Sequence, residues 1–221
     1  MILVRSFSLP AVNRCEILRY AGAKEESPEL RMLLDEVLAE ALPLVTGKVC
    51  WITVPLSRQE NLLNLGFAKI RSDSLCRNLS GCTQVVVFAA TIGLGIDRLI
   101  ARYGRISPSK ALLFQAVGAE RIESLCDVFC EFIANQWESS GLYPAPRFSP
   151  GYGDFPLDIQ RDLFQTLDCA RKIGLTLNES LLMSPSKSVT AFVGLRPHPC
   201  SHSGSGCSCC SKTDCIYRRM P

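Results

Sequence analysis

The sequence has no long apolar run. No 18 consecutive apolar residues occur in the 221-residue chain, which argues against a membrane-spanning helix of ordinary length. Residues 1–5 place no basic segment ahead of an apolar stretch, so they lack the pattern of a secretory signal peptide. We therefore expect a cytoplasmic protein with no membrane partner.

A strong net charge is also missing. The chain has 24 Lys and Arg residues against 21 Asp and Glu residues, a formal net charge of +3. From Arg196 onward four basic residues accompany one acid, Asp214, so the excess lies in this segment and the rest is neutral. Such a balance lacks the basic face of nucleic-acid-binding proteins, and we expect no nucleic-acid partner.

Histidine is scarce, and one familiar glycine motif is incomplete. The two histidines are His198 and His202. Gly93 and Gly95 form a Gly-x-Gly pair, but Arg98 stands where a dinucleotide-binding loop has its third glycine. We therefore expect a tight turn before a helix here, without a nucleotide cofactor.

The sequence does contain a mixture of helix and strand patterns. Apolar residues recur at helical spacing in 27–42, 74–79, 110–137 and 158–173. Strand-like runs occupy the N-terminal segment, 49–54, 85–90 and 189–195, and 179–183 fits either a strand or a helix turn. These patterns predict an α+β fold, with one compact domain over residues 1–195 and a Cys-rich tail over residues 196–221. Gly118, inside the longest helix, is expected at a close helix contact or a slight break.

Cysteine is abundant, with 12 residues. Without a secretion signal, a disulfide framework is the weaker interpretation. Seven cysteines are scattered, mostly among apolar neighbours, and we interpret them as small core residues or incidental thiols. They are Cys15, Cys50, Cys76, Cys82, Cys126, Cys130 and Cys169.

The other five cysteines fall within 200–215. Cys207 and Cys210 form a Cys-x2-Cys pair, Cys215 follows, and Cys200 or His202 can supply a fourth ligand. Clustered thiolates in a reducing compartment favour zinc or an iron–sulfur cluster, and the spacing does not choose between them. A tail with reactive thiols and no metal is the alternative, and the pattern assigns no role to Cys209.

The loop 147–153 has the composition of a binding loop. It contains one arginine, two aromatic residues, two glycines and a proline within seven positions. The guanidinium group of Arg147 is suited to a carboxylate, and glycine lets the backbone approach a ligand closely. This loop suits a small anionic or zwitterionic ligand, and a solvated surface loop is the alternative.

Further motifs follow this loop in a fixed order. After Arg147-x-x-Pro150-Gly151-Tyr152 come an amphipathic helix, the segment 174–180 (Gly-Leu-Thr-Leu-Asn-Glu-Ser), Met183-Ser-Pro185 and Ser188-Val-Thr-Ala191. In order and spacing this series resembles the activation domain of cobalamin-dependent methionine synthase. Free-standing relatives also end in a similar Cys-x2-Cys-x4-Cys run.

The resemblance implies a fold and a ligand. The fold would be a bent, mainly antiparallel sheet packed with helices, and the ligand would be S-adenosylmethionine. Arg147 would hold the ligand's carboxylate, the backbone of Gly151 and Tyr152 would line the site, and Pro150 and Ser188 would contribute to it. Glu131 would face the ligand's amino group, with Glu120 and Glu123 as alternatives.

The resemblance also implies partners. The sequence lacks the Asp-x-His-x-x-Gly segment that binds cobalamin, so the corrinoid would belong to a separate corrinoid-binding or methionine synthase-like protein. The chain would then belong to a cobalamin-dependent methyltransferase system in methionine biosynthesis. A flavodoxin, a ferredoxin or an iron–sulfur cluster in the tail would supply the electron that corrinoid reactivation requires.

Two departures from the family pattern support a second hypothesis. Val193 stands where the family has a tyrosine near the ligand, and residues 153–155 differ from the family after the loop. The chain would then be a metal-binding electron-transfer or adaptor protein that has lost S-adenosylmethionine binding.

Overall fold

The computed structural model describes residues 1–23 and 25–198. Its helices are α1 (Arg14–Ala21), α2 (Pro28–Ala41), α3 (Asp73–Asn78), α4 (Gly95–Tyr103), α5 (Pro108–Glu138), α6 (Ile159–Leu167) and α7 (Cys169–Ile173), with a 3-10 turn, η1 (Leu42–Leu44). Its strands are β1 (Leu3–Ser6), β2 (Lys48–Pro55), β3 (Ser57–Gln59), β4 (Leu62–Asn64), β5 (Lys69–Arg71), β6 (Gln84–Thr91), β7 (Tyr143–Pro144), β8 (Thr176–Leu177), β9 (Met183–Ser184) and β10 (Ser188–Arg196).

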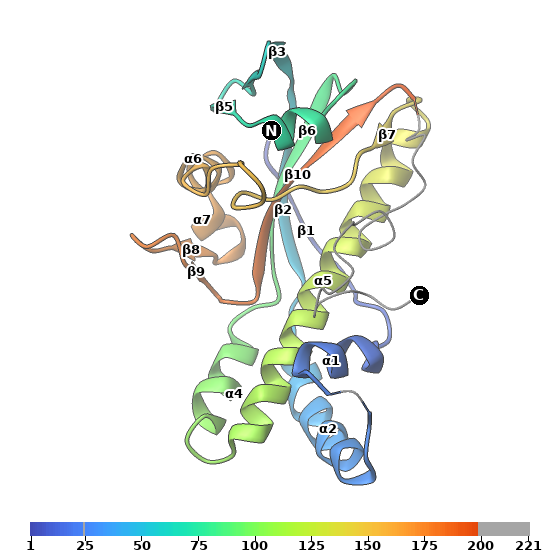
Figure 1. Cartoon of the computed structure of the whole chain (residues 1–221), viewed down its shortest axis with the longest axis vertical. Helices are drawn as coiled ribbons and strands as arrows, with labels where there is room; N and C mark the ends of the chain where they lie inside the picture. Colours follow the sequence, from blue (N-terminus) through green and yellow to red (C-terminus); the bar gives the residue numbers. More distant parts are fainter. Residues whose placement is uncertain (24, 199–221) are drawn as a thin grey trace.

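A five-stranded antiparallel sheet in the order β1-β2-β6-β10-β7 forms the centre of the molecule. Its middle strand β6 is apolar and buried from Val85 to Ala90, as expected of a strand covered on both faces. The sheet twists and curls (Figure 1). The predicted α+β fold with a bent antiparallel sheet is confirmed.

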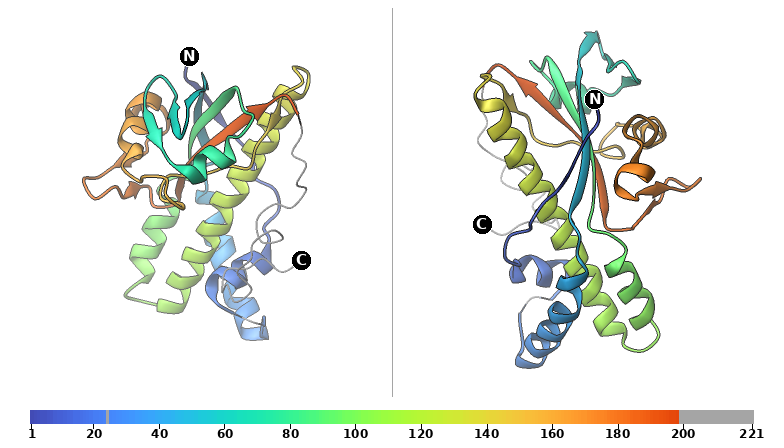
Figure 2. Two further views of the ribbon diagram at one scale, coloured as in Figure 1. Left: turned by 45° about the horizontal axis from the view of Figure 1, so that its top comes forward. Right: turned by 180° about the vertical axis from the view of Figure 1, so that it is seen from behind.

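Helices cover the two faces of this sheet. The long helix α5 crosses one face, and α6 and α7 lie against the other, as both views in Figure 2 show. Successive residues of β6 alternate accordingly: Phe88 packs in the core under α5, and Val87 packs in the core under α6 and α7. On the α5 side, Phe129 contacts the rings of Trp51 and Phe88.

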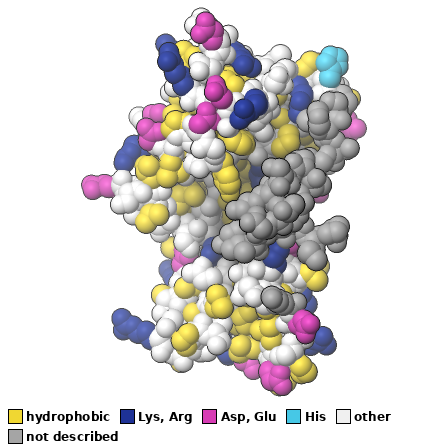
Figure 3. All heavy atoms as spheres, in the orientation of Figure 1, with side chains coloured by type: hydrophobic (Ala, Val, Ile, Leu, Met, Phe, Trp, Pro, Cys, Tyr) yellow, Lys and Arg dark blue, Asp and Glu magenta, His cyan; other side chains and the backbone are white. Residues whose placement is uncertain are grey.

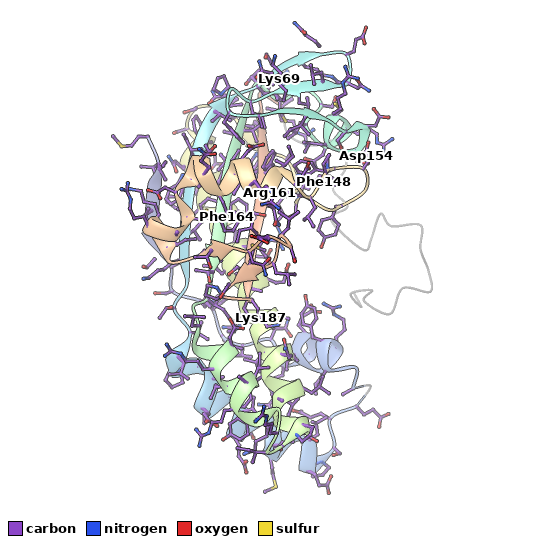
Figure 4. The ribbon with its side chains drawn as sticks, turned by 90° about the vertical axis from the view of Figure 1, so that its left-hand side faces the viewer. Lys69, Phe148, Asp154, Arg161, Phe164 and Lys187 are labelled. Atoms are coloured by element: carbon purple, nitrogen blue, oxygen red, sulfur yellow. The ribbon has the colours of Figure 1, made fainter. Side chains whose placement is uncertain are left out.

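The helix α5 confirms the long predicted helix and the expectation for Gly118. A side chain on Gly118 would approach Ile96 Cγ2 and Lys187 Cε to 2.9 Å. The glycine therefore permits the close approach of α4 and of Lys187, which is labelled in Figure 4. None of the helices in the described ranges combines the length and apolarity needed to cross a bilayer.

Other predicted elements differ from the structure. The helix expected over 158–173 is divided at Asp168, whose φ of 50° is left-handed, into α6 and α7. Most of 179–183 is a loop, and only Met183 enters a strand, β9, which pairs with β8 outside the main sheet. The sequence patterns also did not predict helix α1 or the small β3-β4-β5 sheet, because this helix and these three strands are short.

Candidate functional site

A cavity of about 410 Å³ lies beside the first residues of β10. Its size is that of a small-molecule site. Four of the six predicted binding residues line it: Arg147, Pro150, Tyr152 and Ser188. The remaining lining residues are Glu123, Phe148, Ser149, Gln160, Met183, Val189 and Thr190.

The pocket forms where β10 has a free edge. Phe148 and Phe192 exchange two backbone hydrogen bonds of 2.9 Å, and β7 pairs with the end of β10. Beyond Phe148 the chain turns away at Pro150. Alternate residues of a strand point their backbone groups to the same edge of that strand. The backbone of Phe192 faces Phe148, so the backbone of Thr190, two residues earlier, faces the same edge, where the pocket lies. Within the described part of the chain, no backbone group pairs with Thr190 on this edge.

Arg147 is held by two carboxylates of α5. Its Nη2 donates to Glu123 Oε2 at 2.5 Å, and its Nη1 donates to Asp127 Oδ1 at 2.6 Å. Glu123 and Asp127 are four residues apart, so they lie on one face of the helix. The Arg147 side chain is 23% exposed, against 33% for Glu123 and 53% for Asp127, so solvent screens the pair with Asp127 more than the pair with Glu123.

Two thiols of α5 lie beside the same guanidinium group. Burial raises the pKa of the Cys126 thiol and also that of Cys130. Both thiols are therefore protonated at neutral pH, and the negative charge around Arg147 comes from Glu123 and Asp127. Two carboxylates against one guanidinium leave an excess negative charge, which suits a ligand that carries more positive than negative charge.

Glu131 does not lie with these residues. It is exposed on α5 and is not among the residues that line the pocket. Eight residues of helix separate it from Glu123, about 12 Å along the axis. The structure therefore brings Glu123, the alternative from the sequence, to the pocket together with Arg147. Glu120, the other alternative, is buried and pairs with Arg121.

The loop itself is fastened to α3 by Asp154. This carboxylate accepts hydrogen bonds from the Ser74 N–H (2.9 Å), the Ser72 hydroxyl (2.8 Å) and the Asp73 N–H (2.6 Å). These bonds, first that from Ser74, hold the pKa of Asp154 well below its usual range. Gly153 has a φ of +58°, and a Cβ there would come within 2.6 Å of Ser74 Oγ. The departure from the family pattern at 153–155 is thus a local anchor for the loop (Figure 4).

Gly151 and Tyr152 shape the loop through their own hydrogen bonds. The Gly151 N–H donates to the Phe155 carbonyl at 2.9 Å, and the Tyr152 N–H donates to the Ser149 carbonyl at 3.3 Å. Both amides are thus engaged within the loop. Gly151 has a φ of 92° and does not line the cavity, whereas Tyr152, which is 66% exposed, does line it.

Ser188 and Val193 have different positions along β10. The Ser188 hydroxyl lies 2.8 Å from both the Pro185 carbonyl oxygen and Thr91 Oγ1, so it fixes the start of the strand beside the pocket. Val193 is fully buried in the core under α5 and does not line the cavity. The substitution at Val193 therefore leaves the wall of this pocket unchanged.

A larger cavity, about 700 Å³, lies between residues 6–12 and 42–48. Its buried charge, Arg121, is already paired with Glu120 and donates to the Pro10 carbonyl. The other charged lining residue, Lys48, is exposed, and none of the six predicted binding residues lines this cavity. The β10-edge pocket is therefore the better candidate.

The predicted metal ligands Cys200, Cys207, Cys210 and Cys215 lie outside the described residues, as do His202 and Cys209. Across 1–23 and 25–198, no three His, Cys, Asp or Glu side chains are grouped so as to hold a metal ion.

The fold and the pocket together define a class: an α+β protein with a curled antiparallel sheet and a cavity of small-molecule size at the edge of its last long strand. The family model "Vitamin B12 dependent methionine synthase, activation domain" matches residues 56–203, and the chain belongs to this family. A solved structure described as the MetH reactivation domain bound to AdoHcy is similar, with a TM-score of 0.65 and 15% identity over 91% of this chain and 80% of that one. No curated protein matches the sequence.

Proposed function

We propose that this chain binds S-adenosylmethionine in the β10-edge pocket and supports reductive methylation of a corrinoid on a separate methionine synthase-like protein. The observation that carries this proposal is the Glu123–Arg147 ion pair at the pocket wall. Family membership supports it, and so does the AdoHcy bound to the similar MetH domain.

The charges of the pocket match those of the ligand. S-adenosylmethionine has a carboxylate, an ammonium group and a sulfonium group, a net charge of +1. Arg147 would hold the carboxylate, and Glu123, in the role first given to Glu131, would hold the ammonium group. The surplus negative charge of Asp127 would balance the sulfonium.

The protein's task in this reaction is orientation. The sulfonium supplies an activated methyl group, because its sulfur keeps the bonding electron pair and leaves as a neutral thioether. No general acid or base of this chain is then required. Arg147, Glu123 and the pocket rim at Tyr152 would fix the direction of the methyl group toward the corrinoid partner.

The tail adds a redox component to the proposal. Cys200, Cys207, Cys210 and Cys215 would hold an iron–sulfur cluster or zinc, and a cluster would deliver the electron in the cytoplasm. A flavodoxin or ferredoxin is the alternative electron source. Absence of iron and acid-labile sulfide from anaerobically purified protein would remove the cluster from this account.

One observation favours the second candidate function. Arg147 is already paired with two carboxylates, so its guanidinium group has carboxylate partners without a ligand. A domain with this arrangement could serve as a metal-binding electron-transfer or adaptor protein that no longer binds S-adenosylmethionine.

Calorimetric titration of S-adenosylmethionine into anaerobically purified protein separates the two functions. We expect wild-type protein to bind and Arg147→Ala to bind at least about 10-fold more weakly, about 1.4 kcal/mol. Arg105→Ala, which removes an exposed arginine, is the matched control and should bind normally. A wild-type protein that does not bind S-adenosylmethionine would favour the adaptor function.

A further inference from the structure

Gln160 is a buried pocket residue whose side-chain oxygen has no hydrogen-bond partner among the described residues. Gln160, in the first turn of α6, is only 5% exposed and lines the cavity. Among the described residues, no group donates a hydrogen bond to its Oε1 atom. A buried acceptor without a donor is destabilising, so its presence requires a reason.

The position of Gln160 in α6 makes packing an unsatisfactory reason. Leu163 and Leu167, three and seven residues later, are buried on the same helix face. An apolar residue at position 160 would continue this stripe and bury no polar atom. The amide therefore serves the pocket rather than the core.

The surroundings of Gln160 indicate what it contacts. Phe148, Pro150 and Met183 line the same pocket as Gln160 and give it apolar wall. The side chain of Thr190 shares the α6 side of β10 with Phe192, and its backbone faces the pocket at the free strand edge. A buried acceptor beside an unpaired strand edge, between apolar walls, suits a flat heterocycle with an N–H donor on its rim.

The two ends of the pocket also lie on different sides of the sheet. Glu123 belongs to α5, which covers one face, and Gln160 belongs to α6, which covers the other (Figures 1 and 2). An elongated ligand that wraps around the β10 edge can therefore place its charged end at Arg147 and its heterocycle at Gln160.

We propose that Gln160 is a specificity-determining residue, whose Oε1 accepts a hydrogen bond from the exocyclic amino group of the ligand's adenine. This inference rests on the proposed function, since it assigns the adenine end of the same ligand. A site built around a buried acceptor rejects an analogue that lacks the donor, because the acceptor is then left unpaired.

The test combines a protein variant with a ligand variant. The ligands are S-adenosylhomocysteine and its 6-deamino analogue, in which hydrogen replaces the exocyclic amino group. The proteins are wild type, Gln160→Met and the control Gln165→Met, which changes an exposed glutamine of the same helix. Calorimetry gives the dissociation constants, and thermal unfolding verifies that each variant is folded.

We expect wild-type protein and Gln165→Met to bind S-adenosylhomocysteine about 10-fold more tightly than the deamino analogue. Gln160→Met should bind both ligands equally and about as weakly as wild type binds the analogue. It should also unfold at the same or a higher temperature than wild type, because methionine continues the apolar stripe.

Other outcomes overturn the inference. Equal binding of the two ligands by wild type would show that no protein group accepts a stabilising hydrogen bond from the exocyclic amino group. If Gln160→Met still binds S-adenosylhomocysteine more tightly than the deamino analogue, another residue recognises the amino group. If wild type binds neither ligand, the proposed function fails and the assignment of Gln160 fails with it.

Discussion

At the scale of residues, the pocket depends on a choice between acids of one helix. Glu123, Asp127 and Glu131 follow one another at four-residue spacing on α5, so the helical phase alone cannot rank them. Arg147 meets the first two. The charge balance at the pocket wall is therefore set by where the loop reaches α5, which only the tertiary structure defines.

Glu123→Gln keeps the shape of the side chain and removes its charge. We expect S-adenosylmethionine to bind about 10-fold more weakly, because the ligand's ammonium group loses its counter-charge. Glu131→Gln is the matched control and should bind like wild type. Competition binding would measure the affinity of both variants. Weaker binding by Glu131→Gln together with normal binding by Glu123→Gln would make Glu131 the partner of the ammonium group.

At the scale of elements, the binding loop is held by a helix that does not line the pocket. Asp154 caps the N-terminus of α3 with three hydrogen bonds, and the Asn78 side chain donates to the Pro146 carbonyl at 3.0 Å. The geometry of the loop thus depends on α3, a six-residue helix.

Asp154 gives this attachment a pH dependence. Its pKa in the folded protein is lower than in the unfolded chain, so its stabilising effect is complete above the ordinary Asp pKa of about 3.9 and is lost as pH falls through the lowered value. Asp154→Asn should therefore reduce thermal stability at pH 7 and show a smaller further loss in acid than wild type. Asp158→Asn, at an exposed position, is the control. Parallel acid profiles for Asp154→Asn and wild type would contradict this account.

The sequence predicted elements better than it predicted the site. The helix α5 and the strand β6 follow from long apolar patterns, and both occur where expected. The left-handed turn at Asp168 has no comparable signal, because glycine is the usual residue there. The sequence did contain a signal for Gln160, because this polar residue lies at helical spacing from the apolar residues Leu163 and Leu167. Recognising its role required the pocket, which forms from segments far apart in the chain.

At the scale of the whole molecule, two cavities compete as the ligand site. The cavity at 6–12 and 42–48 is larger, but none of the predicted binding residues lines it. The β10-edge pocket has an excess negative charge, a free strand edge and an unpaired amide. On the face shown in Figure 3, acidic and basic side chains are interspersed. The local charges of the pocket, rather than a broad charge of one sign over that face, would therefore select the ligand.

The central claim is that the β10-edge pocket binds S-adenosylmethionine. Hydrogen exchange of anaerobic protein with and without this ligand, measured by mass spectrometry, tests the claim most directly. We predict that the ligand slows exchange in peptides covering 147–153 and 188–190 and leaves 6–12 and 42–48 unchanged. Slower exchange at 6–12 and 42–48, or no change anywhere at saturating ligand, would contradict the assignment of the β10-edge pocket as the S-adenosylmethionine site.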